Sequence, residues 1–165
     1  MSETTQGEQD PGGDPLFPNV SIYDEQHIQV ALPFLVRVAT RALRALAVPE
    51  DGALVVTLVE PERMAELKEE ALGEHSPTDV LAFPMDDLEN PMPGPFVLGD
   101  IVICPEVAGE QAGAAGHPLN DELAMLLVHG ILHCVGRDHA TPSEETAMFA
   151  EQADLLRLVS TGSIR

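Results

Sequence analysis

Hydrophobic and polar positions change period along the chain, and each period predicts a helix or a strand. Apolar residues fall on one helical face between Gln26 and Leu46, whereas Ala53–Val59 is a β-branched run that we expect to be a strand buried on both faces. Further strands are expected at Asn19–Tyr23, Asp79–Phe83 and Phe96–Cys104, and further helices at 61–72, 105–116, 120–135 and 142–158. The pattern predicts an α/β (α+β) fold, a small mixed four-stranded sheet packed with about five helices.

Residues at the expected helix ends support this division. Gly73 suits the C-terminal stop of one helix. Asn120 is expected to cap the helix 120–135, and either Thr141 or Ser143 the last helix. The stretch LAMLLVHGILHCV in helix 120–135 is apolar nearly all round, so we expect this helix at the centre of the fold.

Composition narrows the class of protein. The chain has 165 residues, 44% of them apolar, which suits one domain over 18–160 preceded by a disordered acidic tail over 1–17. Eight Lys and Arg residues stand against 28 Asp and Glu, a net charge of −20 that favours solubility and disfavours simple binding of a polyanion. There is no signal peptide and no apolar run of membrane-spanning length, so we expect a cytoplasmic protein without a membrane partner.

The segment HGILHCVGRDH carries the candidate chemistry, because it holds His129, His133 and His139. His129 and His133 are four residues apart on the expected central helix, so their rings share one face and can reach one ion. Gly136 can adopt a positive φ, end the helix and bring His139 back toward the pair. Three His ligands without a fourth protein ligand are typical of a catalytic zinc site, so we expect one Zn²⁺ per chain.

Other interpretations of this segment carry less weight. Core histidines that merely pack would leave imidazoles buried without partners, which is costly. Cys134 points about a quarter turn away from His133, so we expect it, like Cys104, to be a buried thiol and not a ligand. The segment also resembles H-E-x-x-H-x-x-G-x-x-H of the metzincin proteases, but the position of their catalytic Glu is Gly130, which cannot accept a proton.

Three segments together resemble one known family. The eleven residues from His129 to His139 match H-G-x-L-H-x-x-G-x-D-H, the signature of the YbeY endoribonucleases. Residues 77–84, PTDVLAFP, resemble that family's P-T-D-V-L-S-F-P, and residues 98–101 are its L-G-D-I. In order and spacing the resemblance covers about residues 19–158.

The resemblance implies a zinc-dependent endoribonuclease specific for single-stranded RNA, with the histidine pair on a central helix. It also implies roles in maturation of the 3′ end of 16S rRNA and in late-stage quality control of 70S ribosomes. The implied partners are rRNA and the small ribosomal subunit with its proteins, and no DNA. Two positions depart from the family pattern: Leu72 stands where many members carry an Arg that helps to bind or orient the phosphodiester, and Ala82 replaces a Ser.

RNA binding needs local positive charge whatever the net charge is. Arg37, Arg41 and Arg44 lie at i, i+4 and i+7 in the stretch 26–49, which contains no Asp or Glu. We expect this arginine stripe to contact RNA phosphates, and an ordinary solvated helix face is the alternative.

Acidic residues near the signature allow two roles each. Asp138 could hold a ligand histidine by a hydrogen bond or simply end the turn. Asp79 and Asp100 could line the site or cap a neighbouring helix. No residue stands out as the general base, so the catalytic residues stay unassigned. The histidines expected to be isolated on the surface are His27, His75 and His117.

Two alternatives to the endoribonuclease stay open. One is a ribosome-assembly factor that acts mainly by binding small-subunit ribosomal proteins, because an acidic surface suits basic partners. The other, which ranks well below it, is a metalloprotease or amidase built on the same three histidines.

Overall fold

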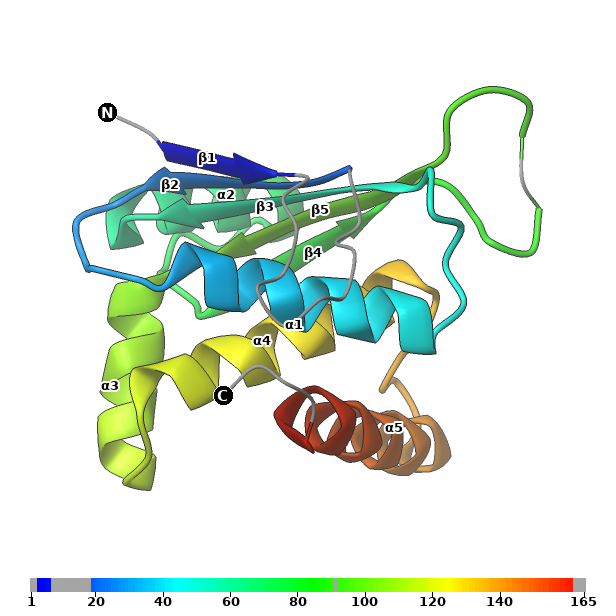
Figure 1. Ribbon diagram of the computed structural model, residues 1–165. Coiled ribbons are helices and arrows are strands. Elements are labelled where there is room, and N and C mark those ends of the chain that lie inside the picture. Colours follow the sequence, from blue (N-terminus) through cyan, green and yellow to red (C-terminus); the bar gives the residue numbers. More distant parts are fainter. Residues whose placement is uncertain (1–2, 7–18, 91, 162–165) are drawn as a thin grey trace.

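A mixed five-stranded sheet forms the scaffold of the computed structural model, which describes residues 3–6, 19–90 and 92–161 (Figure 1). The strands are β1 (Glu3–Gln6), β2 (Val20–Glu25), β3 (Ala53–Val59), β4 (Val80–Pro84) and β5 (Val97–Ile103). The helices are α1 (Leu32–Ala45), α2 (Pro61–Leu72), α3 (Pro105–Ala115), α4 (Leu119–Cys134) and α5 (Pro142–Thr161). The predicted mixed α+β class is therefore confirmed, with one strand more than expected.

The strand order is β1-β2-β3-β5-β4, with β2, β3 and β5 parallel in the centre and an antiparallel strand at each edge. The register aligns Ile22 with Val56, Val56 with Ile101, and Ile101 with Ala82 of β4. The additional strand, β1, lies in the segment predicted to be a disordered tail. That prediction does not hold for Glu3–Gln6, which pair with β2, and the rest of the tail lies outside the described residues.

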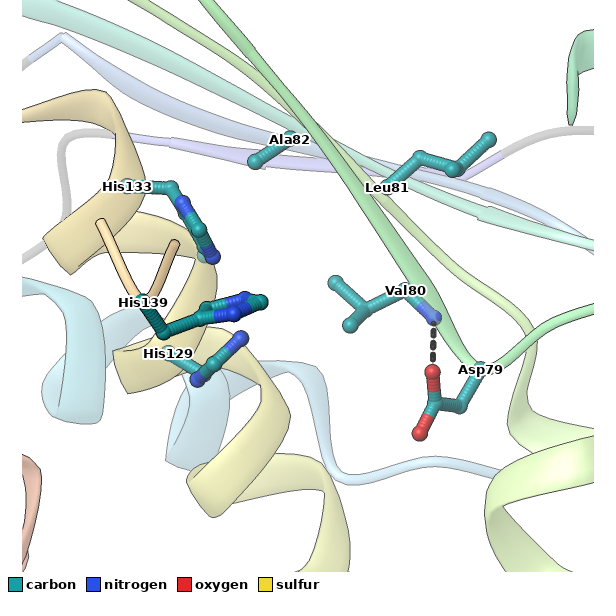
Figure 2. A pocket seen from close by; sticks show the side chains of 8 residues that line it. Asp79, Val80, Leu81, Ala82, His129, His133 and His139 are labelled. Carbon is teal, nitrogen blue, oxygen red and sulfur yellow. Dashed lines mark hydrogen bonds between the residues drawn. The ribbon is translucent and has the colours of Figure 1, made fainter. Parts of the chain in front are cut away.

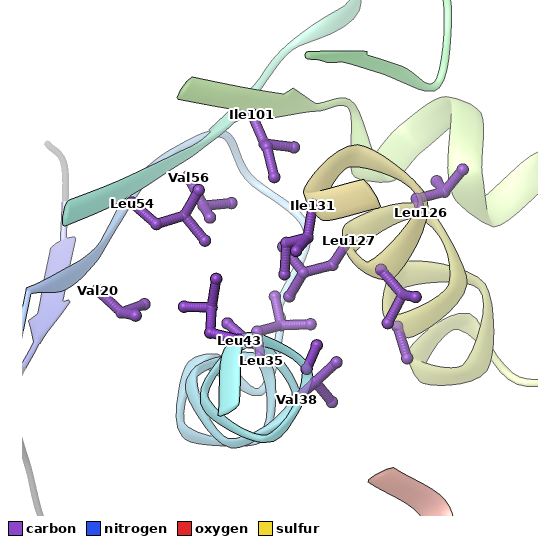
Figure 3. Close-up of a cluster of buried hydrophobic side chains, with 14 of the residues drawn as sticks. Val20, Leu35, Val38, Leu43, Leu54, Val56, Ile101, Leu126, Leu127 and Ile131 are labelled. Carbon is purple, nitrogen blue, oxygen red and sulfur yellow. The ribbon is translucent and has the colours of Figure 1, made fainter. Parts of the chain in front are cut away.

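The main core lies between one face of the sheet and the helices α1, α4 and α5 (Figures 1 and 3). Leu54, Val56 and Leu58 of β3 point into this core and are at most 1% exposed. Each such side chain contributes about 1.5–3 kcal/mol to folding. The alternate residues of β3, such as Val55 and Thr57, are only partly buried.

The prediction that β3 is buried on both faces is therefore wrong. On the second face, the smaller cluster buries only the end of β3, where Val59 packs with Met64 of α2 and with Val102 and Cys104.

The helix α4 lies at the centre, as predicted, and packs against α1, α3, α5, β4 and β5. No helix among the described residues is long and apolar enough to span a membrane.

Two predicted helix starts are wrong, and the reasons are local. The side chain of Gln26 donates to the carbonyl of Ile28 and accepts from its amide, so these backbone groups are satisfied without a helix, and α1 begins at Leu32. Asn120 does not cap α4, because the carbonyl of Pro118 already accepts from the amide of Asp121.

At the start of α5, Thr141 caps the helix in a reciprocal pair with Glu144: the Glu144 amide donates to Thr141 Oγ1, and the Thr141 amide donates to Glu144 Oε1. This settles the choice between the two predicted caps in favour of Thr141.

Candidate metal centre

A pocket of about 270 Å³ lies between α4 and β4 (Figure 2). The strand side is formed by residues 79–82, and the helix side by His129, Gly130 and His133, with His139 beside them. Figure 2 shows the three imidazoles grouped on one side of the pocket, with Asp79 and Val80 across from them.

The three histidines converge as their spacing predicted. The ring centroids of His129 and His133 are 4.8 Å apart, and that of His139 lies 5.8 Å from His129 and 5.1 Å from His133. One ring nitrogen from each lies within 4.8 Å of the other two. The i, i+4 spacing places the first two rings on one face of α4, and the chain must turn back to deliver the third.

Gly136 makes that turn with a φ of +95°, a conformation that favours glycine. The Gly136 amide donates to the carbonyl of His133, and the Arg137 amide donates to that of Leu132, so the last turn of α4 is closed. The guanidinium of Arg137 then pairs with Glu151 of α5 at 2.7 Å. The turn is therefore fastened to the last helix, which holds His139 near the pair.

These residues fit a zinc ion by their chemistry and their spacing. Imidazole nitrogens are preferred zinc ligands. Three nitrogens bound tetrahedrally at about 2.0–2.1 Å from zinc lie about 3.3 Å from one another. The ring nitrogens of this site lie within 4.8 Å of one another, so small side-chain rotations can bring them to that spacing. Burial lowers the pKa of His133, and the positive charge that His129 and His139 can carry lowers it further. A lowered pKa keeps this imidazole in the neutral form that binds a metal.

Gln152 is a residue of this site that the sequence interpretation missed. Its Oε1 lies 2.8 Å from Nδ1 of His129, and the residue is only 8% exposed. The bond favours the tautomer that carries its proton on Nδ1 and leaves Nε2 for a metal. The sequence does contain a sign of this role. Gln152 is a polar residue on the buried face of α5, which otherwise carries Met148, Leu155 and Val159.

The glycine at position 130 is also explained by the packing of α4 against β5. A Cβ atom built at this position would lie 2.9 Å from Cγ2 of Ile101, so a larger residue would push α4 away from β5. The packing of α4 on β5 therefore disfavours a Glu at this position, in addition to its absence from the sequence.

Cys134 is buried against β5, where its Sγ lies 2.8 Å from the position a Cβ of Gly99 would take. Burial raises its pKa to about 12, and the negative charge of Asp100 adds to the effect. The donor group formed by the three histidines does not include this thiol. Cys104 is likewise a buried free thiol.

Of the two acidic candidates, Asp79 lines the pocket and Asp100 does not. Asp100 falls between Gly99 and Ile101, whose positions face α4, so its side chain lies on the opposite face of the sheet. Burial raises the pKa of its carboxyl.

Asp79 is held in place by several donors. Its Oδ1 accepts from the amide of Val80 at 2.7 Å. With the Gln111 amide group turned toward the carboxylates, its nitrogen donates to Asp79 Oδ2 at 3.0 Å and to the buried Glu122 at 3.2 Å. His117 lies 3.1 Å from the other oxygen of Glu122, so it is not the isolated surface residue that was predicted.

Asp138 and the arginine stripe lie outside the pocket lining. The carboxylate of Asp138 accepts a hydrogen bond from the backbone amide of His139 at 2.7 Å. This bond supports the predicted role of Asp138 in ending the turn, and it is not a bond to a histidine ring. The arginine stripe lies on α1, half-buried, with Arg44 near Glu50 at 3.7 Å. Of the two positions that depart from the family pattern, Ala82 lines the pocket, whereas Leu72 is exposed at the end of α2.

Comparison with known proteins identifies the family. The family described as Endoribonuclease YbeY matches residues 21–160. Curated proteins named Endoribonuclease YbeY from Mycolicibacterium gilvum and Nocardia farcinica are 45% and 46% identical to this chain, covering 84% of it and 81% and 78% of their own lengths. One from Clavibacter sepedonicus is 44% identical, covering 84% of this chain and 93% of its own.

A solved structure agrees with the fold. The solution structure of TM1509 from Thermotoga maritima matches with a TM-score of 0.60 and 25% identity, over 85% of this chain and 88% of that one. Both the family match and the relatives extend over most of the chain, including the three histidines. The chain therefore belongs to the YbeY family of endoribonucleases.

Proposed function

We propose that this protein is a zinc-dependent endoribonuclease that cleaves single-stranded RNA. The observation that carries the proposal is the convergence of His129, His133 and His139 at the pocket between α4 and β4. Three imidazoles without a fourth protein ligand are typical of catalytic zinc sites, in which one coordination position stays available.

Each part of the pocket has a proposed task. His129, His133 and His139 would hold the zinc ion, and bound zinc would supply a Lewis acid for the phosphoryl oxygens and a means of activating water. Asp79 is the one carboxylate among the residues that line the pocket, so it is the group placed to orient a water molecule or to accept its proton. Gln152 would hold His129 in the tautomer that binds the metal.

Membership of the family supports a proposal for the biological setting. We propose maturation of the 3′ end of 16S rRNA and late-stage quality control of 70S ribosomes, in the cytoplasm, as the roles. Zinc-loaded protein should cleave a single-stranded RNA, leave the same RNA intact when it is annealed to its complement, and leave casein intact. Cleavage of casein, or no cleavage of any single-stranded RNA by the zinc-loaded protein, would contradict the proposal.

RNA must approach a chain of net charge −20, and we propose the arginine stripe, Arg37, Arg41 and Arg44, as the surface that contacts its phosphates. Replacing all three with Gln should weaken RNA binding and flatten its dependence on salt. Arg63→Gln is the control, because Arg63 lies on α2 and pairs with Glu66. Unchanged affinity and salt dependence in the triple variant would refute this surface.

A second candidate function rests on the acidic composition. A protein with 28 acidic and eight basic residues suits basic partners, so binding to small-subunit ribosomal proteins could be its main work. A zinc-loaded protein that sediments with the small subunit but cleaves no RNA would favour this candidate over the first.

A further inference from the structure

A second group of metal-ligating side chains lies away from the histidine pocket. His27 follows the end of β2, Glu60 directly follows β3, and Glu106 lies in the first turn of α3, after β5. Their donor atoms all lie within 4.8 Å of one another. Nδ1 of His27 is 2.8 Å from Oε2 of Glu60, and its Nε2 is 3.9 Å from Oε1 of Glu106.

The topology of the sheet explains why these residues meet. The strands β2, β3 and β5 are adjacent and parallel, so their carboxyl ends lie side by side at the same end of the sheet. The chain leaves β2 for α1 on one face and leaves β3 for α2 on the other (Figure 1). Where neighbouring parallel strands send their helices to opposite faces, the chain opens a crevice in which α/β proteins bind ligands.

The charges at this position are poorly balanced. Within the described part of the chain, neither Glu60 nor Glu106 forms an ion pair with a lysine or arginine, so His27 alone stands between two carboxylates. The side chains of His27, Glu60 and Glu106 are 65%, 39% and 46% exposed, so an ion from solution can reach them. The net charge of −20 raises the local concentration of cations.

We propose that His27, Glu60 and Glu106 form a second cation site, which binds a divalent transition metal of the Mn²⁺ or Zn²⁺ class. One imidazole with two carboxylates is a mixed nitrogen and oxygen donor set that suits these ions. Water would complete the coordination of so exposed a site. A bound ion would link the end of β2 to the starts of α2 and α3 and so stabilise the fold.

The test is a titration of protein already loaded with one equivalent of zinc, followed by electron paramagnetic resonance of free Mn²⁺. Zinc binds nitrogen ligands more tightly than Mn²⁺, so Mn²⁺ does not displace it from the three histidines. Because the Glu60 carboxylate raises the pKa of His27, the titration is done at pH 8, where fewer protons compete for the imidazole. Wild-type protein should bind one Mn²⁺ per chain.

Glu60→Gln and Glu106→Gln should each weaken Mn²⁺ binding at least tenfold while leaving the zinc equivalent in place. The matched control is His75→Ala. His75 also lies between two carboxylates, 2.6 Å from Glu69 and 3.9 Å from Glu62, yet these three donors do not converge within 4.8 Å. The control should bind Mn²⁺ like wild type.

Absence of Mn²⁺ binding to the zinc-loaded wild type, or equal binding by both Gln variants, would overturn the second site. A second measurement needs no variant: bound Mn²⁺ should broaden the NMR signal of the His27 ring and spare that of His75. Equal broadening of both rings would count against the proposal. Neither result bears on the three-histidine site, because its zinc content is measured separately.

Discussion

The Nδ1 atom of His129 lies 2.8 Å from Oε1 of Gln152, which joins a residue of α4 to one of α5 across 23 positions of the chain. The bond is partly buried, because Gln152 is 8% exposed and His129 is half-buried. A hydrogen bond to one imidazole nitrogen fixes both the orientation of the ring and the nitrogen that carries the proton. The helix α5 therefore contributes to the metal centre, although it supplies no ligand.

Replacing Gln152 with Leu should lower zinc affinity about 10–100-fold, because His129 loses the acceptor that orients it. Gln152→Glu should retain most of the affinity, since a carboxylate oxygen also accepts from Nδ1. Competition with a zinc chelator measures the effect. The exposed Gln29→Leu is the control. Equal zinc affinity in the Leu variant and wild type would rule out the positioning role.

Gly130→Ala should lower the free energy of unfolding by about 1–3 kcal/mol, because the new methyl group meets Ile101. Gly113→Ala in α3 is the matched control. A Cβ there meets nothing within 4 Å, so it should stabilise the protein by about 0.5–1 kcal/mol. Chemical denaturation measures both. A Gly130→Ala variant as stable as Gly113→Ala would show that α4 is not tightly packed on β5.

Cys134 should resist thiol reagents in the folded protein. A pKa of about 12 leaves about one thiolate in 10,000 at pH 8, and the side chain is 4% exposed. Labelling with a disulfide reagent should proceed only on unfolding, so zinc should slow it only as far as zinc stabilises the folded protein. Rapid labelling that begins when zinc is removed would instead mark Cys134 as a ligand.

His75 should titrate above its ordinary pKa of 6.5, because the Glu69 carboxylate accepts a hydrogen bond from it. A raised pKa favours the protonated form in the folded state. Its contribution to stability is therefore complete below pH 6.5 and is lost as the pH rises through the folded-state value. An NMR titration should show the raised midpoint in wild type and a lower one in Glu69→Gln. A wild-type midpoint at or below 6.5 would contradict the bond.

The elements that the sequence predicted best are bounded by residues with strong local preferences. Ala53–Val59 and Pro61–Leu72 have the predicted bounds, because Pro61 starts the helix and Gly73 ends it with a φ of +79°. The predicted starts of α1 and α4 are wrong for a reason that periodicity does not reveal. The side chain of Gln26 and the carbonyl of Pro118 form hydrogen bonds with backbone groups near these two helix starts.

The features of the site that the sequence predicts depend on local contacts, and those that it does not predict depend on contacts between distant segments. The three histidines could be predicted, because spacing on one helix and one glycine turn bring them together. The bond from Gln152, the position of Asp79 across the pocket and the approach of Ile101 to Gly130 depend on how α5, β4 and β5 pack against α4. The pairing of β1 with β2 is also a contact between distant segments.

We propose that RNA cleavage depends on one zinc ion held by His129, His133 and His139. Metal analysis of purified wild type, His133→Ala and the control His75→Ala, paired with cleavage of a single-stranded rRNA fragment, tests it most directly. Wild type and His75→Ala should contain one zinc per chain more than His133→Ala and should cleave the RNA, whereas His133→Ala should not cleave it. A His133→Ala protein that keeps its zinc and cleaves at the wild-type rate would contradict the claim.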